Sequence, residues 1–248
     1  MLGIIGGSGL TQLANLEITH RQVIRTPYGE PSGALTFGSI NGHEVVFLAR
    51  HGYGHTIPPH LVNYRANLWA LQSVDAMDII SVATVGGIHA ALLPGTIVIP
   101  DQIIDYTHSR KHTFHDGTDQ AVTHIDFTEP YSQSIRELCM KAADEIGESY
   151  VDGGVYAAVQ GPRLETAAEI NRMERDGATM VGMTGMPEAG LARELDVNYA
   201  AVCVVANHAA GRGSSAHGIR YEDIGAVVDS AMQRVRRIIE EVVIIHAG

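Results

Sequence analysis

The stretch Met183-Thr184-Gly185-Met186-Pro187-Glu188 joins the end of a strand to the start of a helix. Apolar residues lead into it, and Pro187 is acceptable in the first turn of a helix, where a missing N–H loses no partner. The Thr184 hydroxyl can cap that helix by accepting from an unpaired amide, or it can present itself and the helix N-terminus to a phosphate group. The stretch therefore predicts a strand–turn–helix unit, the building block of α/β folds.

The same alternation of strands and helices runs through all 248 residues. Apolar runs bounded by turn residues predict strands at Leu2–Ile5, Leu35–Ile40, Glu44–Ala49, Ile79–Thr84, Thr96–Ile99, Gly154–Val159, Met180–Met183 and Asn198–Val205. Helical spacing appears over Leu61–Leu71, Tyr131–Ile146 and Ile224–Val242. We expect one α/β domain over residues 1–248 with a largely parallel sheet. Two long loops are expected, His108–His124 and the mobile Gly211–Gly218.

The composition restricts the class of protein. A content of 45% hydrophobic and 18% charged residues is typical of a globular enzyme. The formal charge of -11 disfavours nucleic acid, whose binding needs clustered Lys and Arg. No apolar run approaches the ~20 residues that span a bilayer, and the N-terminus does not resemble a signal peptide. With the 2 cysteines, which suit a reducing compartment, these features predict a cytoplasmic protein without a membrane partner.

Gly3-Ile4-Ile5-Gly6-Gly7-Ser8-Gly9 ends the first predicted strand in a glycine-rich turn. Glycine lets a backbone turn tightly and bring N–H groups up to an anion, and the Ser8 hydroxyl adds a donor. The turn is no Walker loop, because no Gly-Lys-Ser/Thr follows, and Gln12 occupies the third glycine position of a dinucleotide-binding pattern. By itself it is equally consistent with an anion site and with a plain strand–loop connection.

Two further strand ends carry polar side chains. Leu48-Ala49-Arg50-His51-Gly52 offers a guanidinium fork suited to phosphate oxygens and an imidazole that donates when protonated or in the right tautomer, although a surface pair explains it more simply. Ser81-Val82-Ala83-Thr84-Val85-Gly86-Gly87 places Thr84 at the expected carboxyl end of a strand, where open α/β sheets bind ligands; a capped turn explains it as well. Together with Ser8 and Thr184, these ends predict an anion site.

The 13 histidines suggest a metal centre as an alternative. His51 and His55 have helical spacing, as do neighbouring pairs among His108, His112 and His115, but all lie in glycine-rich or polar segments. No His-Glu-x-x-His string or Cys cluster accompanies them. No Gly-x-Ser-x-Gly leads from a strand into a helix either, as a covalent hydrolase would require. We therefore expect no metal and no covalent enzyme intermediate.

The chain resembles the trimeric purine nucleoside phosphorylases from end to end, and looks closest to their methylthioadenosine phosphorylase branch. The strings that carry the resemblance are Ile5-Gly6-Gly7-Ser8-Gly9, Ala49-Arg50-His51-Gly52-Tyr53-Gly54-His55, Val62-Asn63-Tyr64-Arg65-Ala66-Asn67, Gln160-Gly161-Pro162-Arg163 and Met183-Thr184-Gly185-Met186-Pro187-Glu188. The resemblance implies a phosphorylase fold with a mixed central sheet flanked by helices. It also implies a homotrimer with active sites near subunit boundaries, a purine nucleoside substrate, phosphate as co-substrate, and no cofactor.

The resemblance also assigns roles by position. Phosphate would be held by Ser8, Arg50, His51, Thr84, Thr184 and the backbone of Val85. Met183 would lie against the ribose and Leu164 on the purine face. His124 would be lent by a neighbouring subunit to the region around the 5′ end of the sugar.

Two departures from the methylthioadenosine branch concern the nucleobase. Glu165 stands where that branch usually has Ser, and Asn207-His208-Ala209 replaces an Asp-x-Asp pair; Leu164-Glu165-Thr166 and Asn207 instead resemble phosphorylases of 6-oxopurines. An asparagine amide donates to O6 and accepts from protonated N7, and an ionised Glu165 accepts from N1–H, whereas adenine presents a lone pair at N1. From spacing alone, Glu165 is an exposed residue at a helix start.

The segment that covers the 5′ end of the sugar is Gly218–Ile224. Ile219, Tyr221 or Ile224 would favour a thioether, whereas His217 would serve a hydroxyl. With the branch resemblance, we expect phosphorolysis of S-methyl-5′-thioinosine to hypoxanthine and 5-methylthioribose 1-phosphate, with Asn207 as the catalytic group at N7. The alternatives are an inosine/guanosine phosphorylase, a methylthioadenosine phosphorylase, and a nucleotide-binding module without activity.

Overall fold

The computed structural model describes residues 1–117 and 121–248, and the side chains of Tyr221 and Asp223 lie outside the description. The strands are β1 (Leu2–Gly6), β2 (Glu17–Gln22), β3 (Leu35–Ile40), β4 (His43–Ala49), β5 (Asp78–Gly87), β6 (Ile97–Ile99), β7 (Gln102–Asp105), β8 (Val151–Asp152), β9 (Val155–Ala158), β10 (Met180–Gly182) and β11 (Asn198–His208). The helices are α1 (Tyr64–Gln72), α2 (Gln133–Glu145), α3 (Ala167–Arg175), α4 (Gly185–Glu194) and α5 (Tyr221–Ala247), with short 3₁₀ turns η1 (Pro59–Leu61) and η2 (Gly213–Ser215).

The strands form one 11-stranded mixed sheet with the order β2-β3-β4-β1-β5-β10-β9-β7, and β11 joins β5 to β6 and β8 beside this path. The central pairs β4–β1, β1–β5 and β5–β11 are parallel, whereas β2–β3, β3–β4, β5–β10 and β6–β11 are antiparallel. The α/β class and the mixed sheet flanked by helices are therefore confirmed. β2 escaped prediction because all of its residues are exposed and it lacks an apolar run.

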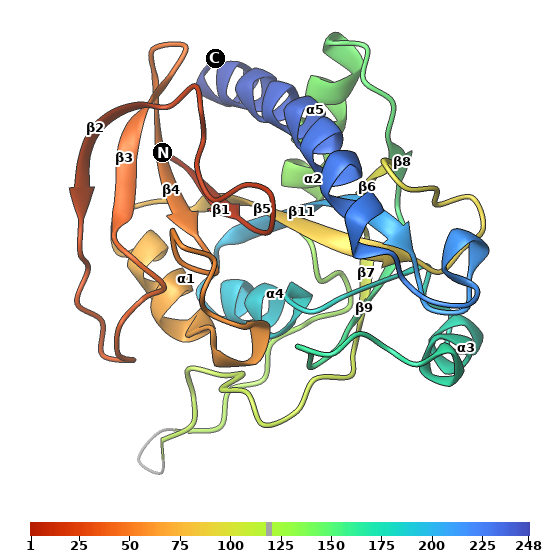
Figure 1. Cartoon of the computed structure of the whole chain (residues 1–248). Helices are drawn as coiled ribbons and strands as arrows, with labels where there is room; N and C mark the ends of the chain where they lie inside the picture. The colour runs from red at the N-terminus through yellow and green to blue at the C-terminus, as the bar shows by residue number, and fades with distance from the viewer. Residues whose placement is uncertain (118–120) are drawn as a thin grey trace.

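Helices cover both faces of the sheet (Figure 1). Alternate residues of β11 point to opposite layers, because successive side chains of a strand face opposite sides. Val202 and Val204 pack with α2 and α5, whereas Cys203 and Val205 pack with α1 and α4. Leu61, expected on the face of α1, lies in η1 and is exposed. Within the described residues, no helix is long and apolar enough to cross a membrane.

The sheet opens at β5. β11 pairs with β5 over Asp78–Gly87 and so occupies one edge of the strand. β1 and β10 must therefore share the other edge, where β1 pairs with 78–81 and β10 with Gly86 and Gly87. In the described sheet, residues 82–85 have no strand partner on that edge. Thr84 thus lies inside β5, within the segment that lacks a partner on this edge, and not at the end of the strand as the sequence suggested.

Candidate active site

A cavity of about 760 Å³ lies at this opening. It gathers residues that are far apart in sequence: the turn after β1, the loop after β4, the middle of β5, the β10–α4 turn, the end of β11 and the start of α5. The expected phosphate ligands that line it are Ser8, Arg50, His51, Thr84, Val85 and Thr184, and the expected nucleoside contacts that line it are Leu164, Glu165, Met183, Asn207, Ala209, Ile219 and Ile224. The structure thus brings together residues that the sequence only suggested.

Arg50 is fully buried beneath the cavity and is held by Glu188 of α4. Its Nε and Nη2 donate to the two Glu188 carboxylate oxygens at 2.7 Å each. Nη2 also donates to Ser81 Oγ, and Nη1 donates to the Val82 carbonyl at 3.0 Å. One N–H of Nη1 has no hydrogen-bond partner among the described residues. Burial alone would lower the pKa of Arg50, but the facing carboxylate outweighs it and raises the pKa.

Glu188 is the partner that the sequence did not reveal. Its carboxylate is fully buried and also accepts from Ser81 Oγ at 2.8 Å and from the Tyr199 hydroxyl at 2.7 Å. Burial alone would raise the pKa of Glu188, but the charge and hydrogen bonds of Arg50 lower it. The pair is therefore ionised and internally neutral, so Arg50 does not act as a free cation.

Gly7 lets the turn after β1 close over this pair. A Cβ at residue 7 would lie 2.5 Å from the Val82 carbonyl oxygen and 2.9 Å from Arg50 Nη1. No side chain fits there, because heavy atoms at such distances clash. The close approach of the Val82 backbone and the Arg50 guanidinium therefore gives a second explanation for glycine at residue 7, besides the anion-binding turn that the sequence suggested.

His51 is neutral, so of the two donor forms that the sequence left open, a protonated ring and a suitable neutral tautomer, the protonated ring is excluded at neutral pH. Its Nδ1 lies 2.8 Å from the Ile57 carbonyl oxygen, and a carbonyl only accepts, so Nδ1 carries the hydrogen. Burial and the nearby charge of Arg50 lower the pKa of His51 to about 4. At neutral pH the Nε2 atom therefore bears a lone pair.

Three hydroxyls complete this end of the cavity. Thr184 precedes α4 but makes no capping hydrogen bond with its side chain, and Met186 inside that helix has non-helical backbone angles. The capping explanation of Thr184 is therefore not realised. Ser8 Oγ lies 3.4 Å from His55 Nε2, and Thr84 is half-buried on the cavity face of β5. The neutral Arg50–Glu188 pair, the neutral imidazole and these hydroxyls form a donor-rich cradle without net charge.

A β-bulge aims Asn207 into the cavity. The register of β11 against β5 shifts between Val205 and Asn207, and bulges re-aim the side chains beside them. Asn207 Nδ2 donates to the His208 carbonyl at 2.7 Å. Since that carbonyl can only accept, the amide has one orientation, with Oδ1 and the second N–H left over.

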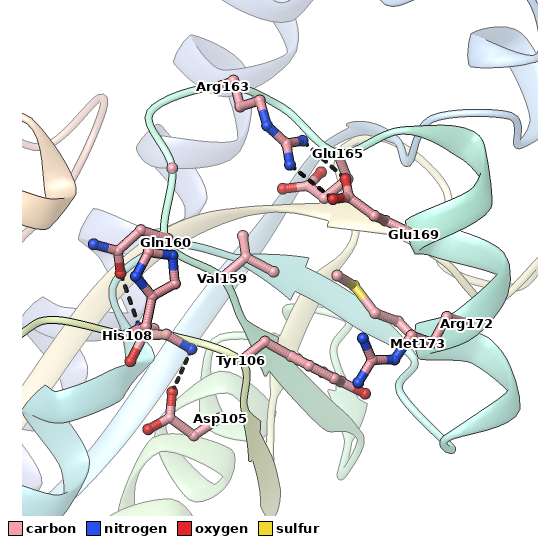
Figure 2. A pocket seen from close by; sticks show the side chains of 12 residues that line it. Asp105, Tyr106, His108, Val159, Gln160, Arg163, Glu165, Glu169, Arg172 and Met173 are labelled. Carbon is pink, nitrogen blue, oxygen red and sulfur yellow. Dashed lines mark hydrogen bonds and ion pairs between the residues drawn. The ribbon is translucent and has the colours of Figure 1, made fainter.

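Glu165 lies between this cavity and a second one of about 600 Å³. Figure 2 shows Glu165 beside the ion pair of Arg163 and Glu169. Thr166 and Glu169 form a capping box at the start of α3, which fixes the turn that carries Glu165. Burial, followed by the charge of Glu169, raises the pKa of Glu165. Glu165 is half-buried, so the interpretation as an exposed helix-start residue is wrong.

Apolar residues line the end of the cavity next to α5. Ile219, Ile224 and Val228 line it, whereas His217 is exposed and is not among the lining residues. Asp229 is the polar group on this stretch of α5. The side chain of Tyr221 lies outside the described residues.

His124 and Arg110 do not line the cavity. His124 is exposed and lies outside the cavity of its own chain. Arg110, which the sequence did not single out, is buried and donates to the carbonyls of Gln160, Met183 and Met186 at 2.6–2.8 Å. It ties the end of β9 to the β10–α4 turn, and its position in a polar loop gave no sign of this. Within the described residues, no cluster of three His, Cys, Asp or Glu side chains could hold a metal ion.

Comparisons with known proteins agree with this geometry. The sequence model of the Phosphorylase superfamily matches residues 1–244. A protein of Pseudomonas syringae pv. tomato named probable S-methyl-5′-thioinosine phosphorylase is 53% identical over 212 residues, 86% of each chain. The 6-oxopurine nucleoside phosphorylase of Pyrococcus furiosus is 47% identical over 215 residues, 85% of this chain and 80% of that one. Methylthioadenosine phosphorylase from Schistosoma mansoni in complex with adenine superposes with a TM-score of 0.94 at 30% identity, covering 100% of this chain and 92% of that chain.

Glu188→Ala should destabilise the protein by about 3–5 kcal/mol, because it leaves a buried guanidinium without its counter-charge. Arg163→Ala, which breaks an exposed ion pair with Glu169, should cost less than about 1 kcal/mol. Because the folded state lowers the pKa of Glu188 from its ordinary 4.5, its ionic contribution is complete above that value. It is lost as the pH falls through the folded pKa. Urea unfolding of both variants at pH 7 and below pH 4.5 measures this, and equal losses at pH 7 would contradict it.

Proposed function

The chain belongs to the phosphorylase superfamily, and on that premise we propose that it cleaves S-methyl-5′-thioinosine with phosphate, releasing hypoxanthine and 5-methylthioribose 1-phosphate. The observation that carries the proposal is the fixed amide of Asn207 in one cavity with Glu165 and a donor-rich cradle. Relatives named for this activity and for 6-oxopurine nucleosides support it.

The base end of the cavity suits a 6-oxopurine. The free N–H of Asn207 donates to O6, and its Oδ1 accepts from N7 when that nitrogen gains a proton. Glu165, when ionised, accepts from N1–H. Adenine would place a lone pair against the carboxylate and an amino group against the Asn207 donor. A site built for one hydrogen-bond pattern can reject the other by ~10⁴-fold, since buried polar groups are left unpaired.

The 5′ end suits a thioether. Ile219, Ile224 and Val228 offer no partner to a 5′-hydroxyl, whereas a methylthio group buries apolar surface against them. Asp229, which lines the same end, supports a second candidate, a general inosine phosphorylase, because its carboxylate would accept from a 5′-hydroxyl.

In the proposed reaction the C1′–N9 bond breaks and its electron pair goes to the purine, while a phosphate oxygen forms the new bond to C1′. Hydrogen phosphate loses its proton as it becomes the sugar phosphate ester, and the departing purine gains one proton, so the protons balance. The residues position the two reactants and stabilise charge. Asn207 accepts a hydrogen bond from the purine N7 once that nitrogen is protonated. Phosphate is a co-substrate, and the chain's own side chains supply the catalysis.

We further propose that the enzyme works as a homotrimer in which His124 completes the sugar end of a neighbour's cavity. The position of His124 supports this, since it is exposed and lies outside the cavity of its own chain.

A substrate panel tests the function. With phosphate present, methylthioinosine should release base with the highest kcat/KM, followed by inosine, and methylthioadenosine should be poorer by ~10²-fold or more. Base release is followed by absorbance, with a reaction lacking phosphate as control. A preference for methylthioadenosine would refute the assignment of Glu165 and Asn207.

Asn207→Asp should lower kcat/KM for methylthioinosine by ~10²–10³-fold, because an ionised carboxylate cannot donate to O6, and it should improve the ratio in favour of methylthioadenosine. Asn171→Asp, an exposed substitution on α3, serves as the control and should leave both values unchanged. Unaltered selectivity in Asn207→Asp would show that Asn207 does not contact the 6-position.

Mixed trimers test the role of His124. His124→Ala and Asn207→Ala should each be impaired as homotrimers. When they are co-expressed, some sites combine an intact Asn207 with an intact neighbouring His124, so activity at low substrate concentration should recover. Light scattering should give three times the 26.6 kDa chain mass. Absence of recovery in a mass-verified trimer would place His124 outside the neighbouring site.

A further inference from the structure

The tautomer of His51 is fixed by the backbone of its own loop. The N–H groups of Thr56 and Ile57 both donate to the His51 carbonyl, at 3.0 and 3.1 Å, which closes a tight turn. This turn holds the Ile57 carbonyl 2.8 Å from His51 Nδ1. A carbonyl oxygen has no hydrogen to offer, so the imidazole must donate there. Its other nitrogen, Nε2, is then the acceptor.

Nε2 is available to a ligand. His51 lines the cavity, and in the part of the chain that the structure describes Nε2 has no hydrogen-bond partner. The ionisable groups that act on the ring are Arg50, His55 and Glu188. Burial and the Arg50 charge keep the ring neutral by lowering its pKa to about 4. The other cradle groups are the hydroxyls of Ser8, Thr84 and Thr184, which can donate or accept, and the remaining N–H of Arg50, which can only donate. Nε2 is thus the cradle atom that can only accept.

We propose that His51 Nε2 accepts a hydrogen bond from the P–OH group of hydrogen phosphate, and so restricts the anion site to oxyanions that carry a proton. This inference rests on the proposed function, since it assumes that phosphate occupies this end of the cavity. Hydrogen phosphate and hydrogen arsenate both bear one O–H at neutral pH. Sulfate has the same shape and charge but no hydrogen.

The other cradle groups cannot make this distinction. A hydroxyl can rotate to donate to a bare oxygen or to accept from a P–OH group, and the guanidinium donates to a bare oxygen of either anion, so these groups serve phosphate and sulfate equally well. At Nε2, however, a sulfate oxygen would place its lone pairs against the nitrogen lone pair, and both atoms would remain unpaired. Sites that require a substrate hydrogen reject analogues that lack it by large factors, so one atom can set the selectivity of the whole cradle.

Competition between anions tests the proposal on the wild-type enzyme. At pH 7.5 and constant ionic strength, arsenate should replace phosphate in base release with a similar KM. Sulfate should inhibit competitively with a Ki about 10²-fold or more above the phosphate KM. His51→Gln should bring the ratio of sulfate Ki to phosphate KM close to one, since a side-chain amide can turn to donate or to accept. His217→Gln, which changes an exposed histidine outside the cavity lining, should keep the wild-type ratio.

The outcomes separate the two claims. No base release with phosphate or arsenate, for any nucleoside, would overturn the proposed function and this inference with it. Phosphate-dependent release combined with a sulfate Ki near the phosphate KM in the wild type would overturn only the role of His51. An unchanged ratio in an active His51→Gln enzyme would do the same.

Discussion

The cavity depends on the buried ion pair between Arg50 and Glu188. β5 loses its neighbour on one edge where β1 has ended and β10 has not begun. Arg50, at the end of β4, fills that interruption by donating to the Val82 carbonyl and to Glu188 of α4. A buried carbonyl needs a donor, and the rigid guanidinium fork supplies several in fixed directions. An apolar pair of similar size would leave the Val82 carbonyl without a donor, so the fold requires a hydrogen-bond donor at the point where the sheet opens.

The same pair determines the electrostatics of the proposed reaction. Arg50 is the one Lys or Arg among the described residues that line the cavity, and Glu188 cancels its charge. Phosphate would therefore be held by dipoles, not by a free cation. The negative charge of phosphate would then stabilise the positive charge that develops on the sugar in the oxocarbenium-like transition state. A free cation would strengthen phosphate binding in the ground state and would oppose the developing positive charge, so tighter binding would not accelerate the reaction.

The sequence predicted local features well and non-local ones poorly. β3 was predicted with its observed bounds because Leu35, Phe37 and Ile40 place apolar side chains along it and turn residues flank it on both sides. Thr84 was wrongly predicted at the end of its strand. β5 continues to Gly87, where it pairs with β10, and no local sequence pattern indicates that pairing. The partnership of Arg50 with Glu188 joins two motifs that were each recognised, but their separation in the chain concealed the contact. The pocket residues were found through family resemblance, whereas the hydrogen-bond polarity of His51 and the burial of Arg110 are properties of the folded chain.

In the proposed site, both ends of the cavity would obtain their selectivity in the same way. Histidine and asparagine are ambiguous side chains, since each can present a donor or an acceptor to a given point. Here a backbone carbonyl removes the ambiguity, Ile57 for His51 and His208 for Asn207. The first carbonyl is placed by the tight turn at 51–57 and the second by the strand end beyond the bulge of β11. Under both proposals, specificity for the anion and for the purine would be encoded partly in the main chain, and a relative could keep both side chains yet change its substrate by moving either carbonyl.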